Sequence, residues 1–184
     1  MKKGKSVKVG IVVALLVLGV GFAVISTTLN MNGTANLKGN ASEFNKSILF
    51  VKDGAKAAKI EASIPGKTGT VTVSEDGKTL SFETPILDTV NETATVTYYV
   101  ENRGPYDAKL GEIKCDVTGT NSEYISVNAD INYKGLELVA GTEANPTQTE
   151  EASTIEVKLI KSYASDEPAS VEITCQLPAE VVNK

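Results

Sequence analysis

Apolar and polar residues alternate one by one through most of the chain after Ser26. Residues 58–64 read AKIEASI, residues 95–100 read TVTYYV, and residues 155–159 read IEVKL. Side chains of a β-strand point alternately to opposite faces, so this period of two is typical of strands with one buried face. No segment after residue 26 has the period of 3.6 that an amphipathic helix shows. The sequence therefore predicts an almost purely β fold.

Two turn sequences predict hairpins. Asp76-Gly77 favours a two-residue type I′ turn, because both central positions of that turn need a positive φ. The register that follows pairs Val73 with Leu80 and Val71 with Phe82. A similar turn at Lys134-Gly135 would pair Tyr133 with Leu136 and Ile131 with Leu138.

The spacing of the strands and turns indicates the architecture. About nine to eleven short strands, with turns every 8 to 12 residues, are typical of an antiparallel β-sandwich, immunoglobulin-like or jelly-roll-like. A closed barrel is the alternative. Residues 141–152 form the longest polar stretch and are expected to be an exposed loop. We assign residues 27–184 to this domain.

Residues 1–26 have a different pattern. Four lysines (Lys2, Lys3, Lys5 and Lys8) precede an apolar run over residues 9–25, which ends at Ser26. A basic start, an apolar stretch and small residues at its end are typical of a secretory signal, here with cleavage after Ala23. Alternatively the run is an uncleaved anchor helix of roughly 26 Å, with the lysines on the cytoplasmic side. Both interpretations place residues 27–184 outside the cytoplasm, in the medium or on the outer face of the membrane.

Cys115 and Cys175 are the two cysteines of the chain. Each is in phase with the inward-facing apolar residues of its own predicted strand, so both thiols are expected to point into the core. An exported protein meets an oxidising environment, in which such a pair forms a disulfide. Two free thiols buried in the core are the alternative.

Composition excludes several classes of function. From Ser26 onward there are 14 basic and 23 acidic residues, a net charge of −9, which disfavours binding to nucleic acid. The chain has no histidine, so Ser-His and Cys-His nucleophiles and the common zinc sites are not available. Gly66-Lys67-Thr68 lacks the preceding glycine and the following helix of a phosphate-binding loop and is expected to be a polar turn. We predict no catalytic residue, no metal site and no cofactor.

The sequence also resembles a known group of proteins. The segment GVGFAVISTTLNMNGTANLKGN leads from the apolar run almost directly into a strand, and Val100-Glu101-Asn102-Arg103-Gly104 has a V-x-N-x-G pattern. Both features are similar to uncharacterised exported β-sandwich surface proteins of Gram-positive bacteria, with export signals of the camelysin and biofilm-fibre type. The resemblance covers most of the chain. It implies a surface location and a sandwich fold, and it supplies no activity that could be assigned residue by residue.

These observations favour a non-enzymatic surface protein, membrane-tethered or secreted, with a structural or adhesive role that includes a fibre-type subunit. The alternative is a secreted binding module that recognises a glycan or a protein through its loops. The expected partners are the membrane, if residues 1–26 stay attached, and further copies of the chain. An N-terminal strand is expected at residues 27–37. In the isolated domain it is expected to pair with its own sheet, because a tethered strand has a high effective concentration, and copies would associate where it adds to a neighbour's open edge instead.

Overall fold

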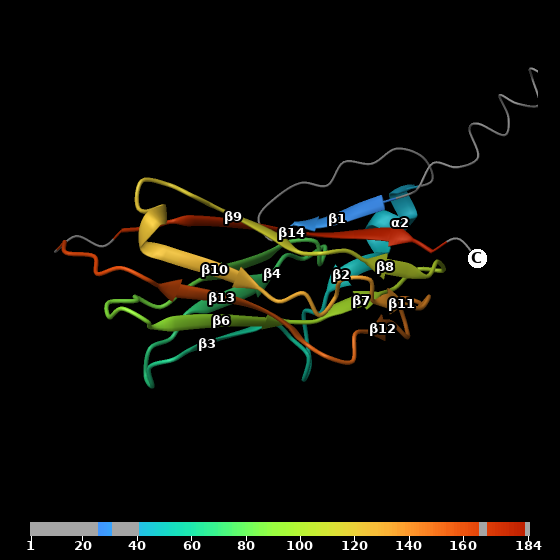
Figure 1. Ribbon diagram of the computed structural model, residues 1–184. Helices are drawn as coiled ribbons and strands as arrows, with labels where there is room; N and C mark the ends of the chain where they lie inside the picture. Colours follow the sequence, from blue (N-terminus) through green and yellow to red (C-terminus); the bar gives the residue numbers. More distant parts are fainter. Residues whose placement is uncertain (1–25, 31–40, 166–168, 183–184) are drawn as a thin grey trace, which may run out of the picture.

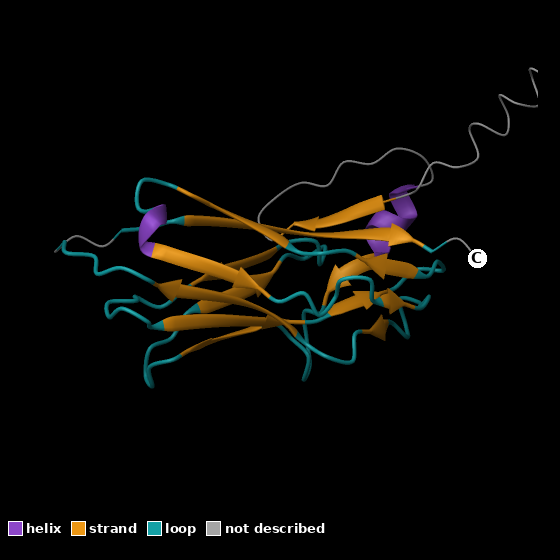
Figure 2. Ribbon diagram, in the orientation of Figure 1, coloured by secondary structure: helices purple, strands orange, loops and turns teal. Residues whose placement is uncertain are grey.

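The computed structural model describes residues 26–30, 41–165 and 169–182, and these residues are mostly β-strand (Figure 1). Every strand pair that forms a sheet is antiparallel. Two short helical segments lie near opposite ends of an elongated body (Figure 2). The almost purely β character predicted from the sequence is confirmed.

The first sheet is organised by one long strand, β14 (Glu172–Val181). On one side β14 pairs with β1 (Ser26–Asn30), and on the other side it pairs first with β9 (Lys114–Thr118) and then with β8 (Ala108–Leu110). The outer edge of β8 carries β11 (Glu137–Leu138). Because β14 has a partner on both sides, it is the central strand of this sheet.

Three further sheets complete the described strands. The second sheet has the order β10 (Ile125–Ala129), β13 (Ser153–Leu159), β6 (Thr93–Tyr98) and β3 (Lys59–Ala62). A third has the order β12 (Thr147–Gln148), β7 (Val100–Asn102) and β2 (Ile48–Phe50), and β4 (Thr70–Val73) pairs with β5 (Leu80–Glu83). The helical segments are α2 (Ala41–Ser47) and the 3₁₀ helix η1 (Ser122–Tyr124).

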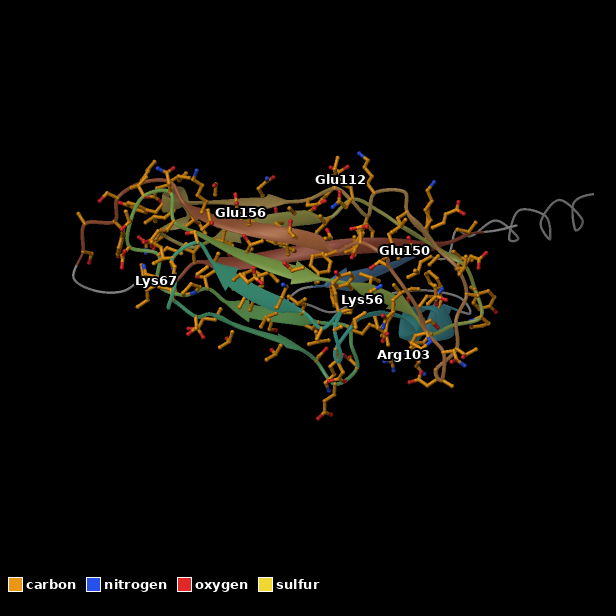
Figure 3. All side chains as sticks on the ribbon, turned by 90° about the horizontal axis from the view of Figure 1, so that it is seen from below. Lys56, Lys67, Arg103, Glu112, Glu150 and Glu156 are labelled. Atoms are coloured by element: carbon orange, nitrogen blue, oxygen red, sulfur yellow. A yellow bond between two sulfur atoms is a disulfide. The ribbon has the colours of Figure 1, made fainter. Side chains whose placement is uncertain are left out.

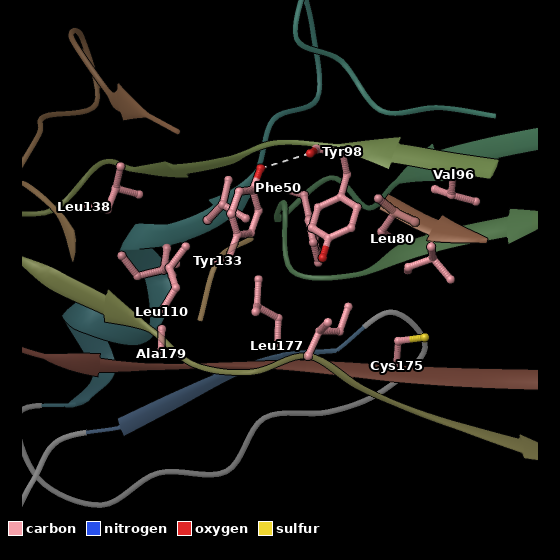
Figure 4. Close-up of a cluster of buried hydrophobic side chains, with 14 of the residues drawn as sticks. Phe50, Leu80, Val96, Tyr98, Leu110, Tyr133, Leu138, Cys175, Leu177 and Ala179 are labelled. Carbon is pink, nitrogen blue, oxygen red and sulfur yellow. Dashed lines mark hydrogen bonds between the residues drawn. The ribbon is translucent and has the colours of Figure 1, made fainter. Parts of the chain in front are cut away.

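The core lies where β14 and β8 face β6 and their neighbours (Figure 4). Leu177 and Cys175 of β14 are fully buried, and so are Val96 and Tyr98 of β6. The Tyr98 ring also meets two other buried rings edge to face, those of Phe50 at 5.6 Å and Tyr133 at 5.7 Å between centroids. Such edge-to-face aromatic pairs add to the stabilisation that burial alone gives.

The alternation that predicted the strands matches their burial. In β6 the residues alternate between half-buried and buried, and β13 repeats that pattern over seven residues. Buried positions therefore face the core, while their neighbours face outward. The second sheet forms where the sequence pattern was most regular.

The hairpin of β4 and β5 has the predicted register, with Val73 opposite Leu80 and Val71 opposite Phe82. Its turn type was predicted wrongly. Gly77 has a φ of 70°, whereas Asp76 is not among the positive-φ residues of the described chain. Ser74 and Thr79 close a longer loop instead, and the Asp76 carboxylate accepts hydrogen bonds from the Ser74 hydroxyl at 2.6 Å and the Lys78 N–H at 3.0 Å. These side-chain bonds stabilise a four-residue turn, residues 75–78, in which Gly77 takes the positive φ.

The hairpin predicted at Lys134-Gly135 does not form, although a turn does: the Leu136 N–H donates to the Tyr133 carbonyl at 3.0 Å, and Gly135 has a φ of 79°. Strand β10 ends at Ala129, and Leu138 pairs with Ala108 of β8 instead of Ile131. The Leu110 N–H donates to the Leu136 carbonyl at 2.8 Å. Residues 136–138 therefore pair with β8 and not with residues 131–133, their predicted partner. Ile131, expected to face inward, is 62% exposed.

Two other expectations need correction. Helix α2 was not predicted, although its seven residues agree with the absence of any helix longer than two turns in the described chain. Residues 141–152 are not one exposed loop, because they contain β12 and the buried Thr149. Short elements of this kind leave too few residues for a periodic pattern to be recognised.

The structure describes only the first part of the predicted N-terminal strand. A strand was expected at residues 27–37, and the structure has β1 over Ser26–Asn30, paired with Gln176–Glu180 of β14. Residues 31–37 and the apolar run at residues 9–25 lie outside the described residues. Within the part of the chain that the structure describes, no helix has the length and apolar character needed to cross a bilayer.

Candidate binding groove

The disulfide between Cys115 and Cys175 is present, as predicted. The two residues are direct partners in the β9–β14 register, with Cα atoms 4.0 Å apart, and Cys175 is fully buried. The bond joins residues 60 positions apart in the sequence. Cross-linking a loop of that length stabilises a fold by about 4 kcal/mol in the chain-entropy account. This pair is part of the framework of the first sheet.

The V-x-N-x-G segment is also structural. Asn102 is fully buried, and its side-chain amide donates to the carbonyls of Tyr106 at 2.8 Å, Val139 at 3.1 Å and Leu138 at 3.3 Å. Its side-chain oxygen accepts the Gly104 N–H at 2.9 Å. An asparagine is suited to this position because its amide offers two donors and an acceptor at one site. Asn102 thereby holds the end of β7 against the segment that follows β11.

Two charged clusters lie toward opposite ends of the molecule (Figure 3). At one end Arg103 bonds the buried Glu101 carboxylate, with Nη2 2.6 Å from Oε1, and the exposed Glu143 carboxylate at 2.7 Å. The Gln148 amide donates to the other oxygen of Glu101 at 3.1 Å. Both oxygens of this buried carboxylate therefore have partners, and the guanidinium is occupied by two carboxylates.

The second charged cluster contains the lysine of the Gly66-Lys67-Thr68 sequence. Its ammonium lies 2.9 Å from Glu92 Oε2 and 3.1 Å from Asp88 Oδ2, and it donates to the Ile86 carbonyl at 3.0 Å. The Lys67 ammonium, helped by backbone N–H groups, lowers the pKa of Glu92 to about 2. This lysine is thus committed to internal contacts, in keeping with the polar turn expected from the sequence.

A groove opens between β11 and β12, and it is the candidate site. Its volume is about 710 Å³. Two segments line it, one from the end of the turn after β10 through β11 and one containing β12: Asn132, Tyr133, Leu136, Glu137, Leu138, Val139, Thr147, Gln148, Thr149, Glu150 and Glu151. Both strands are the outermost members of their sheets.

Tyr133 belongs to the wall that contains β11, and its hydroxyl bonds the wall that contains β12. Its ring is buried, and its hydroxyl lies 2.9 Å from Thr149 Oγ1, 2.9 Å from the Glu151 carbonyl and 3.1 Å from the Tyr98 carbonyl (Figure 4). Burial raises the pKa of this hydroxyl to about 12, so it stays protonated and can donate at neutral pH. At one end the Thr147 hydroxyl donates to the Ala140 carbonyl at 3.2 Å. These bonds tie the two walls together.

The walls expose both main-chain groups and apolar side chains. In an antiparallel ladder alternate residues bond to the partner strand. The Leu136 carbonyl bonds β8 and the Thr149 N–H bonds β7, so the peptide groups of Glu137 and Gln148, one position away, point to the free edges. Leu136 and Val139 are 37% and 55% exposed. The groove thus combines unpaired strand edges with apolar surface.

The rim of the groove is acidic. Glu137, Glu150 and Glu151 are exposed, and none of them takes part in an ion pair with another described residue. Two lysines lie nearby. Lys109 is opposite Glu137 in the β8–β11 register, and Lys56 donates to the Thr149 carbonyl at 2.6 Å and lies 5.2 Å from the centre of the Tyr99 ring.

The sequence reasoning did not find this groove. It placed the lining residues in a hairpin and in an exposed loop, and although these segments are close in the chain, neither assignment predicted two facing walls with a strand in each. The described residues hold no group of three or more His, Cys, Asp or Glu side chains that could bind a metal ion. What the groove can do chemically is bind: it offers hydrogen-bonding strand edges, apolar side chains and negative charge.

Comparison with known proteins found no family model, no curated protein and no solved structure that matches this chain.

Proposed function

We propose that this protein is a non-enzymatic surface protein whose β-sandwich domain lies outside the cytoplasm, tethered to the membrane or secreted, with an adhesive or structural role. The observation that carries the proposal is the Cys115–Cys175 disulfide, built into a β core downstream of a basic and then apolar N-terminal sequence. Disulfides persist in oxidising compartments and are rare in the cytosol. The bond and the N-terminal pattern independently favour export.

The sandwich assignment is supported by how the sheets share one core. Leu177 and Ala179 of the first sheet and Val96 and Ile155 of the second belong to the same buried cluster. Two antiparallel sheets that bury a common face are the defining arrangement of a sandwich. A closed barrel is less compatible with the observed pairing, because β1 and β3 end their sheets without a second partner among the described strands.

The non-enzymatic assignment is supported by how the polar residues are used. The most buried carboxylates, Glu92 and Glu101, are bound by Lys67 and Arg103 respectively. Asn102 is occupied by four hydrogen bonds to main-chain groups. Residues of this kind hold loops in place, so these buried groups are not free to act as nucleophile or base.

The proposal is tested on protein from its own cells. Cells are treated with a thiol-alkylating reagent before lysis, and the intact mass of the protein is then measured. We expect an unalkylated Cys115–Cys175 pair and either the full mass or the mass expected for cleavage after Ala23. Protease added to intact cells should degrade the domain. Alkylation of both cysteines together with protection from the protease would overturn the proposal.

The second candidate is a secreted binding module, which the groove between β11 and β12 favours. The sequence suggested that loops would recognise the ligand, whereas the observed groove lies between two strand edges. The two candidates share the extracellular location and differ in role, since the first is structural or adhesive and the second recognises a ligand. The melting and self-association of residues 27–184 and residues 38–184 separate them.

A further inference from the structure

We propose that the groove between β11 and β12 binds an extended, lysine-bearing peptide segment of another protein. The inference deepens the binding role that the groove favours above by naming the class of partner. Three features define the occupant: the free strand edges, the exposed apolar side chains and the acidic rim. Each restricts a different property of the ligand.

The strand edges require an extended peptide. Glu137 and Gln148 direct their peptide groups away from β8 and β7, at the free edges of β11 and β12. A peptide in β conformation can bond to such an edge through its main chain, as in β-strand addition. A folded surface could not bring its own main-chain groups to these positions unless it also presented an edge strand.

The walls require apolar side chains on the ligand. Val139 and Leu136 are exposed next to the buried Leu138 and Tyr133. In an extended peptide, alternate side chains point to the same face, so one set can contact this apolar surface. The other set then points toward the rim.

The rim requires positive charge at those other positions. Glu137, Glu150 and Glu151 are exposed and lie outside the ion pairs of the described chain. Lysines alternating with apolar residues would place their ammonium groups near these carboxylates. A second copy of this domain fits poorly, because two domains that each carry a net charge of −9 from Ser26 onward repel one another.

The probe is a blocked seven-residue peptide of alternating lysine and valine, and the protein is the full chain purified in a neutral detergent. Calorimetry measures the affinity of the peptide for the original protein and for a variant with Glu137→Gln, Glu150→Gln and Glu151→Gln. We expect binding to the variant to be about tenfold weaker, because each exposed ion pair contributes a factor of about 2 to 3. The affinity for the original protein should fall as salt is added.

A second variant with the same change of charge provides the control. Glu75, Glu123 and Glu172 are exposed and lie outside the groove, so replacing all three by Gln should leave the affinity within about twofold. Equal weakening in both variants would mean that net charge alone attracts the peptide and would overturn the proposal. Val139→Ser should weaken binding, whereas Val90→Ser, at an exposed valine outside the groove, should not.

The main-chain contribution is tested with a probe of the same sequence whose main-chain nitrogens are all methylated. Methylation removes the N–H donors and leaves the charges, so we expect the affinity to fall at least tenfold. Equal binding of this probe, of spermidine or of a neutral oligosaccharide would overturn the proposal, and so would no binding of the original probe. The measurement uses purified protein, so its result does not depend on where the cell places the chain and can be separated from the export experiment.

Discussion

Lys67 Nζ lies 2.9 Å from Glu92 Oε2 across 25 residues of sequence, and this pair joins the turn after β3 to the start of β6. The Glu92 carboxylate also accepts the Asp88 N–H at 2.9 Å. The contact therefore fixes two loops at one end of the molecule, and its strength depends on the ionisation of the carboxylate.

Acid should weaken this contact in a defined pH range. The folded pKa of Glu92 is lowered to about 2 from an ordinary value of 4.5. The stability it contributes is fully present above pH 4.5 and is lost as the pH falls toward 2. Glu92→Gln should melt at a lower temperature than the original protein at pH 6, with a difference that shrinks as the pH approaches 2. Thermal melts at half-unit steps measure it, and a constant difference would contradict the prediction.

Lys78 gives a second pH dependence, whose cause is burial of a cation rather than an ion pair. Burial lowers the pKa of its ammonium to about 8 from 10.5, and its Nζ donates to the Ile48 carbonyl at 2.6 Å. Because the unfolded chain holds this proton more tightly, the stability should rise between pH 8 and 10. Lys78→Met should reduce that rise, measured by urea unfolding at pH 8, 9 and 10. Lys52→Met, at an exposed position, should leave it unchanged.

The disulfide should contribute more to stability than any other single contact. Replacing Cys115 and Cys175 together by Ala should lower the free energy of unfolding by about 4 kcal/mol, because the unfolded chain regains the freedom of a closed loop. Urea unfolding with and without a reductant measures this. Reductant should destabilise the original protein and have no effect on the double variant. A loss below about 1 kcal/mol would contradict the prediction.

The free energy of unfolding should be sensitive to a substitution of Asn102 that removes only its side-chain amide. Asn102→Ala removes the donor to three carbonyls and the acceptor of the Gly104 N–H. Leaving buried polar groups without partners costs about 1–3 kcal/mol, so we expect a loss of about 3 kcal/mol in urea unfolding. Asn128→Ala, at an exposed position in β10, should change the stability by less than about 0.5 kcal/mol. Equal effects of the two substitutions would contradict the role given to Asn102.

Strand β1 provides a test of the structural role. Purified residues 27–184 should melt at a higher temperature than residues 38–184, because the shorter chain leaves Gln176–Glu180 of β14 without their partner. Light scattering shows whether either form associates. If both forms melt alike and both stay monomeric, the strand is neither a stabilising element nor a means of self-association. The binding module would then be the better hypothesis.

The sequence predicted the parts of the fold that depend on local pattern. Residues 93–98 and 153–159 alternate without interruption, and their strands form with the expected faces buried. The register of Val73 and Leu80 was correct although the turn was not, because a two-residue and a four-residue turn centred on the same residues give the same pairing. Cys115 and Cys175 were correctly paired because each follows the period of its own strand.

The parts that were missed depend on contacts between distant segments. Leu138 pairs with Ala108 because Leu110 bonds the Leu136 carbonyl, and no local feature of residues 131–138 reveals that competition. The groove arises because the outermost strands of two different sheets lie beside each other. Its position therefore depends on the order of strands in space, which alternation along the chain does not encode.

The central position of β14 also determines the order in which the protein can mature. Its partners β1, β8 and β9 all precede it in the chain. During synthesis these three strands therefore cannot pair with β14 until residues 172–181 have emerged. Strand pairing over such long separations is slow, because a large loop must close first. A polypeptide that folds late stays unfolded for longer, and an unfolded chain can pass through a narrow translocation pore. Under the export proposed above, the Cys115–Cys175 bond forms only after both cysteines have crossed, and the closed loop then opposes movement of the chain back through the pore.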